Sequence, residues 1–427
     1  MKEAVAFATL FLGLAVGPQT VQVLVSHEVS AVEILVDGRQ LARIEGEPWE
    51  ALCNLGESLK PRNMEAVAYS AAGIEIGRAS VWLNSEMGPA AAEILVDTDP
   101  ESGKVVAHVR STSQTSERPE RFTAVFDGVP VEATDPNEIV LPPHDPDQLH
   151  YLRVDLEFAG SVTSTVERTF GGSFVDDVAT ELTAVPLQLS GQADEAALER
   201  PYWLLAEGSE ATVVDVVSGP GELIVIRDQS AQARLDRMVR RAAVSYRSVA
   251  SLKRGDTVRI MSPVPKHLPR SGLDLSLYDG TPPLTSKEGG LLWFLTNIRT
   301  PRVPLRMQRL STAVAVAGAD AASSQRRRAV VLLLGPQPAD NSRYAPREVR
   351  RYLEAMHVPF AVWSTEGERE TPWGRAKDIS SMGKFQRVTK QLVKRMQLQR
   401  IAWVRGVYHP PQISLDPSET GIRLAGT

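Results

Sequence analysis

The feature that most constrains the fold is a change of sequence pattern near residue 172. Between about residues 20 and 170, apolar and polar residues alternate in short runs that are separated by turns such as Asp37-Gly38 and Asp127-Gly128. Alternation with a period of two, interrupted by Asp-Gly, is typical of β-hairpins. Beyond residue 172, near-continuous apolar runs alternate with segments of helical periodicity. That pattern is typical of parallel sheets covered by helices on both faces.

These patterns predict a multidomain chain. Short strands at intervals of 8–12 residues predict two antiparallel β-sandwich modules of immunoglobulin-like (Ig-like) size, at residues 19–85 and 90–172. Residues 173–427 are predicted to form a third domain, an α/β fold with a doubly wound parallel sheet. Its strands are expected to include 222–226, 329–334 and 401–404, and residues 346–356 are expected to form a helix with Val349, Leu353 and Met356 facing inward.

The charge of the chain is unevenly distributed. Residues 1–180 hold 12 Lys and Arg against 28 Asp and Glu, and the remaining residues hold 35 against 24. Solvated surface explains such a difference most simply, but two other interpretations remain open. In the first interpretation, the acidic and basic parts of the chain dock on each other. In the second, the basic part binds an anionic partner.

The N-terminus and the cysteine content bear on localisation. Residues 5–16 form an apolar block that is too short to span a bilayer, so residues 1–18 are a candidate signal peptide, with an uncleaved N-terminal element as the alternative. Export to the periplasm, the medium or the cell surface is therefore expected. Because Cys53 is the single cysteine, the chain has no intrachain disulfide, and its apolar surroundings predict a buried thiol.

The apolar run Glu222–Ile226 ends in Asp228-Gln229-Ser230, which is followed by a helical pattern. A carboxylate and a hydroxyl two residues apart are hard oxygen ligands of the kind that Mg²⁺ or Ca²⁺ needs. Open α/β sheets bind their ligands at the carboxyl ends of their strands. Asp228 and Ser230 are therefore candidate site residues.

Four short segments resemble the von Willebrand factor type A (VWFA) family, and more narrowly the bacterial VWFA-related proteins of the acidobacterial type. They are residues 224–230, 252–258, 329–335 and 358–364, and the resemblance covers roughly the last 60% of the chain. It implies a type A domain behind Ig-like modules. It also implies a metal-ion-dependent adhesion site built from Asp-x-Ser-x-Ser, a Thr and a distal Asp.

The resemblance carries over only in part. Asp228 and Ser230 match, whereas Gln232 replaces the second Ser and Gly335 stands where the distal Asp is expected. We therefore expect a degenerate site without a metal, because an amide and a glycine remove ligand charge. Ser230 also has a structural role open to it, as a cap of the following helix.

Other residues complete the predicted site. Thr285 or Ser286 takes the place of the family's Thr, and Asp340 lies five residues after the position of the distal Asp. The alternative to a metal-free site is weak binding of Mg²⁺ or Ca²⁺ by Asp228, Ser230 and Thr285. A ligand at a sheet edge is not part of the core, so Asp228→Ala is expected to leave the fold intact.

Catalysis and nucleic-acid binding are not expected. The chain lacks the Gly-x-Ser-x-Gly, His-Glu-x-x-His, Cys-x-x-Cys and glycine-rich phosphate motifs, and His357 is interpreted as a packing residue. Arg326–Arg328 and the basic helical segment from Lys384 to Arg395 suggest a polyanion partner, but the pI near 5.9 argues against a dedicated nucleic-acid binder.

The sequence thus predicts a non-catalytic protein-binding or adhesion protein. Its binding face is expected around the candidate site residues and Trp373, which lies in a turn-rich loop and is predicted to contact the partner. A scaffold or assembly factor of a cell-envelope or secretion complex is the alternative, and a hydrolase is the third class. No later segment of the chain is long and apolar enough to cross a membrane either.

Overall fold

The computed structural model divides the chain into two compact units, one of residues 1–58, 62–178 and 269–275, and one of residues 59–61, 179–268 and 276–427. Each unit is considered by itself. The structure describes the following residues: 4–11, 13–85, 90–98, 104–113, 118–145, 148, 150–158, 162–170, 182–191, 198, 203–240, 252–265, 278–299 and 304–426.

The first unit begins with a β-sandwich. One sheet has the order β1-β2-β5 and the other β4-β3-β6-β7, and every pairing in them is antiparallel. The strands are β1 (Val5–Phe7), β2 (Pro18–Val25), β3 (Ala31–Val36), β4 (Arg39–Ile44), β5 (Glu50–Asn54), β6 (Arg62–Tyr69) and β7 (Glu75–Leu83). Asp37 and Gly38 join β3 to β4 with φ of 51° and 75°. These positive angles are those of a two-residue hairpin turn, so the predicted hairpin is confirmed.

The apolar N-terminal block is part of this sandwich. Strand β1 pairs with β2 from Val5 opposite Val25, and Leu14 is fully buried. The backbone N–H of Ala15 donates to Oδ1 of Asn84 at 2.6 Å. Cys53 is buried, and burial raises the pKa of its thiol, in agreement with the prediction. Export stays a prediction.

A second β-sandwich follows. Its sheets have the orders β11-β10-β13-β14 and β12-β9-β8, again antiparallel throughout. The strands are β8 (Ala90–Thr98), β9 (Val105–Ser113), β10 (Arg121–Phe126), β11 (Val129–Val131), β12 (Ile139–Val140), β13 (His150–Phe158) and β14 (Val162–Phe170). Alternate residues of β13 point inward, and Leu152, Val154, Leu156 and Phe158 are buried. The two predicted Ig-like modules are thus present as sandwiches.

The second unit contains one mixed sheet of order β21-β20-β19-β23-β24-β26-β25, with β22 beside β20. Strands β20, β19, β23, β24 and β26 are parallel to one another, and β21, β22 and β25 are antiparallel to their neighbours. The bounds are β19 (Gly221–Arg227), β20 (Thr257–Pro265), β21 (Tyr278–Gly280), β22 (Leu284–Thr285), β23 (Arg327–Leu334), β24 (Phe360–Ser364), β25 (Arg369–Thr371) and β26 (Gly374–Asp378).

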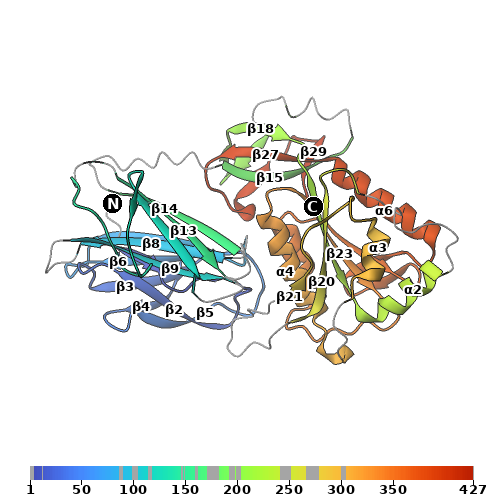
Figure 1. Cartoon of the computed structure of the whole chain (residues 1–427), viewed down its shortest axis with the longest axis horizontal. Coiled ribbons are helices and arrows are strands. Elements are labelled where there is room, and N and C mark those ends of the chain that lie inside the picture. Colours follow the sequence, from blue (N-terminus) through green and yellow to red (C-terminus); the bar gives the residue numbers. More distant parts are fainter. Residues whose placement is uncertain are drawn as a thin grey trace. The chain divides into compact units, whose positions relative to one another are not determined.

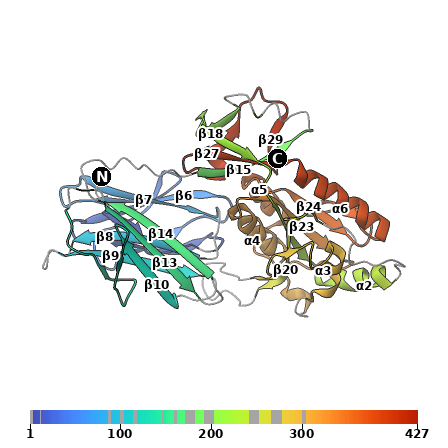
Figure 2. The same cartoon turned by 45° about the horizontal axis from the view of Figure 1, so that its top comes forward.

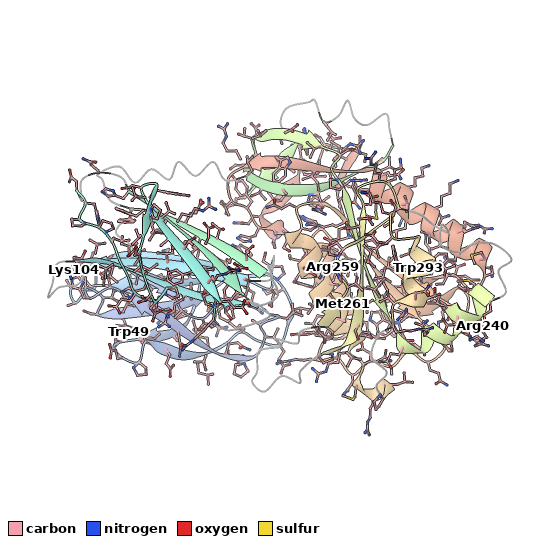
Figure 3. The ribbon with its side chains drawn as sticks, in the orientation of Figure 1. Trp49, Lys104, Arg240, Arg259, Met261 and Trp293 are labelled. Atoms are coloured by element: carbon pink, nitrogen blue, oxygen red, sulfur yellow. The ribbon has the colours of Figure 1, made fainter. Side chains whose placement is uncertain are left out.

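Helices pack against this mixed sheet. They are α2 (Gln232–Arg240), α3 (Leu291–Asn297), α4 (Leu310–Ser323), α5 (Pro346–Ala355) and α6 (Met382–Gln397). Figure 1 shows α4 on one side of β20 and β23, and α2, α3 and α6 on the other. Arg259 and Trp293, labelled in Figure 3, belong to β20 and α3, and Arg259 Nη1 pairs with Asp320 Oδ2 of α4 at 2.5 Å. None of the helices in the described ranges is long and apolar enough to span a bilayer.

Two further antiparallel sheets belong to this unit. They have the orders β18-β27-β15-β29 and β17-β16-β28. The strands are β15 (Leu182–Leu189), β16 (Leu204–Ala206), β17 (Ser209–Glu210), β18 (Val213–Val217), β27 (Gln399–Arg405), β28 (Ile413–Leu415) and β29 (Ile422–Leu424). Figures 1 and 2 show β15, β18 and β27 beside one another. They enclose a core of their own, which includes Leu187, Ala402 and Val404.

The predicted fold class is therefore wrong. The protein is mostly β, built largely of small antiparallel sheets, and residues 173–427 do not form a single doubly wound, type A domain. The strands near the two ends of that region, β15 and β27, pair with each other antiparallel in a separate sheet. The apolar segment at 401–404 was expected as a strand of the parallel sheet, but it forms β27, which pairs antiparallel with β15 and β18. A buried apolar run has the same appearance in either kind of sheet.

Candidate functional site

Asp228 lies directly after β19, and none of its surface is exposed. Its carboxylate accepts hydrogen bonds from Ser230 N at 3.2 Å, Gln308 Nε2 at 3.1 Å, Gly335 N at 2.9 Å and the Ser230 hydroxyl. A carboxylate has about four lone-pair positions. The donors of the protein therefore occupy the positions that a metal ion or a ligand needs.

Gly335 lies at the end of β23, where the resemblance places a distal Asp. A Cβ at this position would come within 2.3 Å of both Ala231 N and Ser230 Oγ. Gln337 N also donates to Ser230 Oγ at 3.1 Å. The loops after β19 and β23 thus pack backbone against backbone, and they leave no space for a side chain at residue 335.

Gln308 completes this group and was not predicted from the sequence. Its side chain is fully buried. Besides its bond to Asp228, its Oε1 accepts from Gln229 N at 2.9 Å, and its main-chain oxygen accepts from Asn341 N at 2.8 Å. We call Asp228, Ser230, Gln308 and Gly335 the Asp228 network. No sequence pattern marks Gln308, because its partners come from distant strand ends.

Asp340 forms a second group of the same kind. Its carboxylate accepts from Ser311 N at 3.3 Å, Ser311 Oγ at 2.5 Å, Ser342 N at 3.1 Å and Ser342 Oγ at 2.5 Å. Ser311 is the second residue of α4, so Asp340 supplies an acceptor to the free N–H groups at the start of that helix. Asp340 thus caps helix α4, and its place on a binding face stays a prediction.

Trp373 was predicted to be an exposed contact residue, and that prediction is wrong. Its side chain is 5% exposed, and its Nε1 donates to Ser311 Oγ at 3.1 Å. The residue follows β25 in the turn to β26, and it fills the space beside the start of α4. A Pro-Trp-Gly sequence identifies a turn, but it does not determine whether the indole points inward.

Thr285 and Ser286 lie away from the Asp228 network. Thr285 pairs with Thr257 at the start of β20, and Thr257 pairs with Glu222 at the start of β19. Asp228 lies six residues further along the direction of β19, or about 20 Å at roughly 3.3 Å per residue. Thr285 instead donates its N–H to Glu288 Oε2 at 2.7 Å. It belongs to the amino edge of the sheet.

The predicted metal ligands are therefore not assembled in one place. Asp228 and Ser230 bond to each other, and Thr285 lies at the opposite edge of the sheet. Within the described ranges, no three His, Cys, Asp or Glu residues gather as a metal site requires. The metal-free site that the sequence favoured, and the weak binding of Mg²⁺ or Ca²⁺ that was its alternative, both stay predictions.

A groove lies at the carboxyl edge of the mixed sheet, with a volume of about 620 Å³. Helix α2, the loop after β24 and the loop from β26 into α6 line it; we call it the α2–α6 groove. Its apolar lining comes from Leu235 and Met238 of α2, Ile379, and Met382 at the start of α6. Its remaining lining residues are Arg234, Arg237, Thr365, Glu366, Gly367, Asp378, Ser380, Ser381 and Lys384.

Charged residues of both signs line this groove. Arg234 Nε pairs with Glu366 Oε1 at 2.6 Å, and Lys384 Nζ pairs with Asp378 Oδ2 at 2.5 Å. Partial burial raises the pKa of Asp378, but the bonds from Lys384 and Ser380 outweigh it, so the net shift is downward. Arg237 is exposed and donates to Ala233 O in its own helix at 3.3 Å. No sequence motif identified this groove, because its lining comes from three segments that are far apart in the sequence.

The run Arg326–Arg328 is not an exposed basic patch. Arg327 is buried and pairs with Asp256 Oδ1 at 2.9 Å, and Arg328 is 1% exposed and donates to Ala322 O at 2.5 Å near the end of α4. Burial and the neighbouring Arg328 lower the pKa of His357 to about 4, so this imidazole is neutral at pH 7. The interpretation of His357 as a packing residue agrees with its burial.

Known proteins give little guidance. No protein-family model and no curated protein matches the chain, so the resemblance to type A domains stays a prediction. The fibronectin(III)-like modules of Clostridium thermocellum CbhA match 18% of this chain and 92% of their own, at 20% identity and a TM-score of 0.17. The central fibronectin-III array of RIM-binding protein matches 44% of this chain and 76% of its own, at 11% identity and a TM-score of 0.21.

A β-glucuronidase from Parabacteroides merdae matches 39% of this chain but only 25% of its own, at 12% identity and a TM-score of 0.17. Such values are too low to support any inference about activity. The chain contains β modules of the immunoglobulin or fibronectin type, as its sheets show directly.

Proposed function

We propose that this chain is a non-catalytic protein-binding protein and that the α2–α6 groove is its binding site. One observation carries the proposal: charged residues of both signs surround an apolar floor, in which Met382 is partly exposed while Leu235, Met238 and Ile379 are buried. An apolar centre surrounded by a polar rim is the usual composition of a protein–protein interface.

The α2–α6 groove is distinct from the Asp228 network, around which the sequence predicted the binding face. That network lies at the ends of β19 and β23, and its side chains are committed to one another. The groove begins at α2, directly after the network, so the network fixes the start of the helix that lines the groove. Asp228 and Ser230 are thus positioning residues for α2, and the partner contacts α2 itself.

A photo-crosslinking amino acid tests the proposal. Benzoylphenylalanine placed at Arg237, on the rim of the groove, is compared with the same residue at Glu210, an exposed position on β17. After irradiation in extracts of the source cells, a defined partner protein is expected to attach at position 237 and not at position 210.

A second substitution links the product to the groove. Met382→Glu places a charge in the apolar lining and is expected to abolish the crosslink at position 237 while the circular dichroism spectrum stays unchanged. Equal products at both positions, or a product at 237 that Met382→Glu does not affect, would show that the groove is not the site.

A scaffold or assembly factor is the second candidate. Helix α6 supports it, because this helix carries five Lys and Arg residues and no Asp or Glu. A helix with a single sign of charge suits docking on an acidic surface.

A further inference from the structure

The charges of α6 lie on one face of the helix. Successive residues of an α-helix turn by about 100°, so Lys384, Arg387, Lys390, Lys394 and Arg395 fall within an arc of about 140°. All five side chains are exposed. The opposite side of the helix packs into the core through Phe385, Val388, Leu392 and Met396. We call the five residues the basic face of α6.

Most of these charges are not neutralised within the chain. Lys384 pairs with Asp378 at 2.5 Å. The structure gives Arg387, Lys390, Lys394 and Arg395 no carboxylate within ion-pair distance among the residues that it describes. Charges on exposed helices are commonly balanced by opposite charges three or four residues away, but α6 has no acidic residue with which to form such pairs.

The neighbouring strand adds to the same positive field. Lys377 of β26 lies beside α6, where its Nζ is 3.4 Å from Gln391 Oε1. Partial burial and the nearby charge of Arg395 lower the pKa of Lys377. The carboxylate of Glu368 acts in the opposite direction, and the net shift of the Lys377 pKa stays downward.

We propose that the basic face of α6 docks an acidic segment of a partner protein. The spacing of the charges fits such a segment: from Arg387 to Lys390 to Lys394 the helix rises by about 4.5 and 6 Å. Carboxylates three and four residues apart on a partner helix have the same separation. This surface lies outside the α2–α6 groove except for Lys384, so the inference does not depend on the groove.

Two observations favour an acidic protein over a nucleic acid. Proteins that bind single strands stack the bases on exposed aromatic rings, whereas Phe385, the aromatic residue of α6, is fully buried. The chain also has a net charge of −5, and its first 180 residues carry 28 Asp and Glu against 12 Lys and Arg. A chain of net negative charge repels a long polyanion more strongly than a short acidic segment.

The test measures binding of a fluorescein-labelled polyglutamate peptide of about 20 residues to the full chain at low salt. The double variant Lys390→Glu/Lys394→Glu is expected to weaken binding at least about tenfold. The matched control Arg347→Glu/Arg351→Glu makes the same change in net charge at exposed positions four residues apart on α5 and is expected to change binding less than about twofold. Wild-type binding should weaken steeply with added salt.

Three further measurements separate the partner classes. An oligothymidylate of about 20 nucleotides and vesicles containing phosphatidylserine are titrated in parallel, and sedimentation velocity at low salt measures self-association. Tighter binding of the oligonucleotide or the vesicles through Lys390 and Lys394 would overturn the proposal. So would self-association that the α6 variant abolishes, or equal loss of peptide binding in the two double variants.

Discussion

Replacing Asp228 by alanine should strongly destabilise the second unit. The substitution removes the acceptor of four hydrogen bonds and leaves two buried donors, Gly335 N and Gln308 Nε2, without their partner. An unsatisfied buried donor costs about 1–3 kcal/mol. Two of them give a loss of about 4 kcal/mol in the free energy of unfolding, which corresponds to a fall in Tm of about 8–16 °C for a unit of this size.

This expectation reverses the one drawn from the sequence, in which Asp228 was a peripheral ligand. Urea unfolding of the full chain, followed by tryptophan fluorescence, measures the loss. Glu210→Ala, at an exposed position on β17, provides the control and should change the free energy of unfolding by less than about 0.5 kcal/mol. An Asp228→Ala variant within about 1 kcal/mol of wild type would refute the structural role of this carboxylate.

The remaining predictions concern three other positions. Gly335→Ala should destabilise by about 1–3 kcal/mol in urea unfolding, because its Cβ meets Ala231 N at 2.3 Å, whereas Gly383→Ala, with nothing within 4 Å of its Cβ, should not. Trp373→Phe should cost about 1 kcal/mol through the lost bond to Ser311; a loss below about 0.3 kcal/mol contradicts this. His150 should make the second sandwich more stable at pH 5.5 than at pH 8.5, and this difference in the free energy of unfolding should shrink in His150→Gln. An equal difference in the wild type and in His150→Gln would disprove this.

The sign for His150 follows from its surroundings. Burial lowers its pKa, but the bonds to Asp127 Oδ2 and to the main-chain oxygen of Asp145, both at 2.7 Å, outweigh burial and raise the pKa above its usual value. His144 also faces the ring, with 4.5 Å between centroids. A raised pKa in the folded state gives stability that is complete below the unfolded pKa, about 6.5, and is lost as pH rises through the folded value.

The local elements were predictable from the sequence. Asp37-Gly38 and Asp127-Gly128 both form the predicted hairpin turns, since few other sequences accept positive φ at two successive residues. The helix at Pro346–Ala355 was also predictable, with Val349 and Leu353 buried as its periodicity indicated. These features depend on neighbours in the sequence.

The candidate site was not predictable in the same way. Asp228 and Ser230 lie at a strand end as expected, but the sequence does not show that Gln308 and Gly335 donate to the same carboxylate. Thr285 was assigned to that group because it is a hydroxyl in a loop, and only the pairing of β22 with β20 places it at the other edge. Burial and register depend on contacts between distant residues.

Hydrogen exchange at the Gly335 amide tests most directly whether the Asp228 network is a structural element. This N–H donates to Asp228 Oδ2 at 2.9 Å inside the protein. Read by mass spectrometry with single-amide resolution, it should exchange as slowly as the amides of β23 in wild type and much faster in Asp228→Ala. Rapid exchange at Gly335 in the wild-type protein would contradict the account, because an open carboxylate at Asp228 would again be available to a ligand.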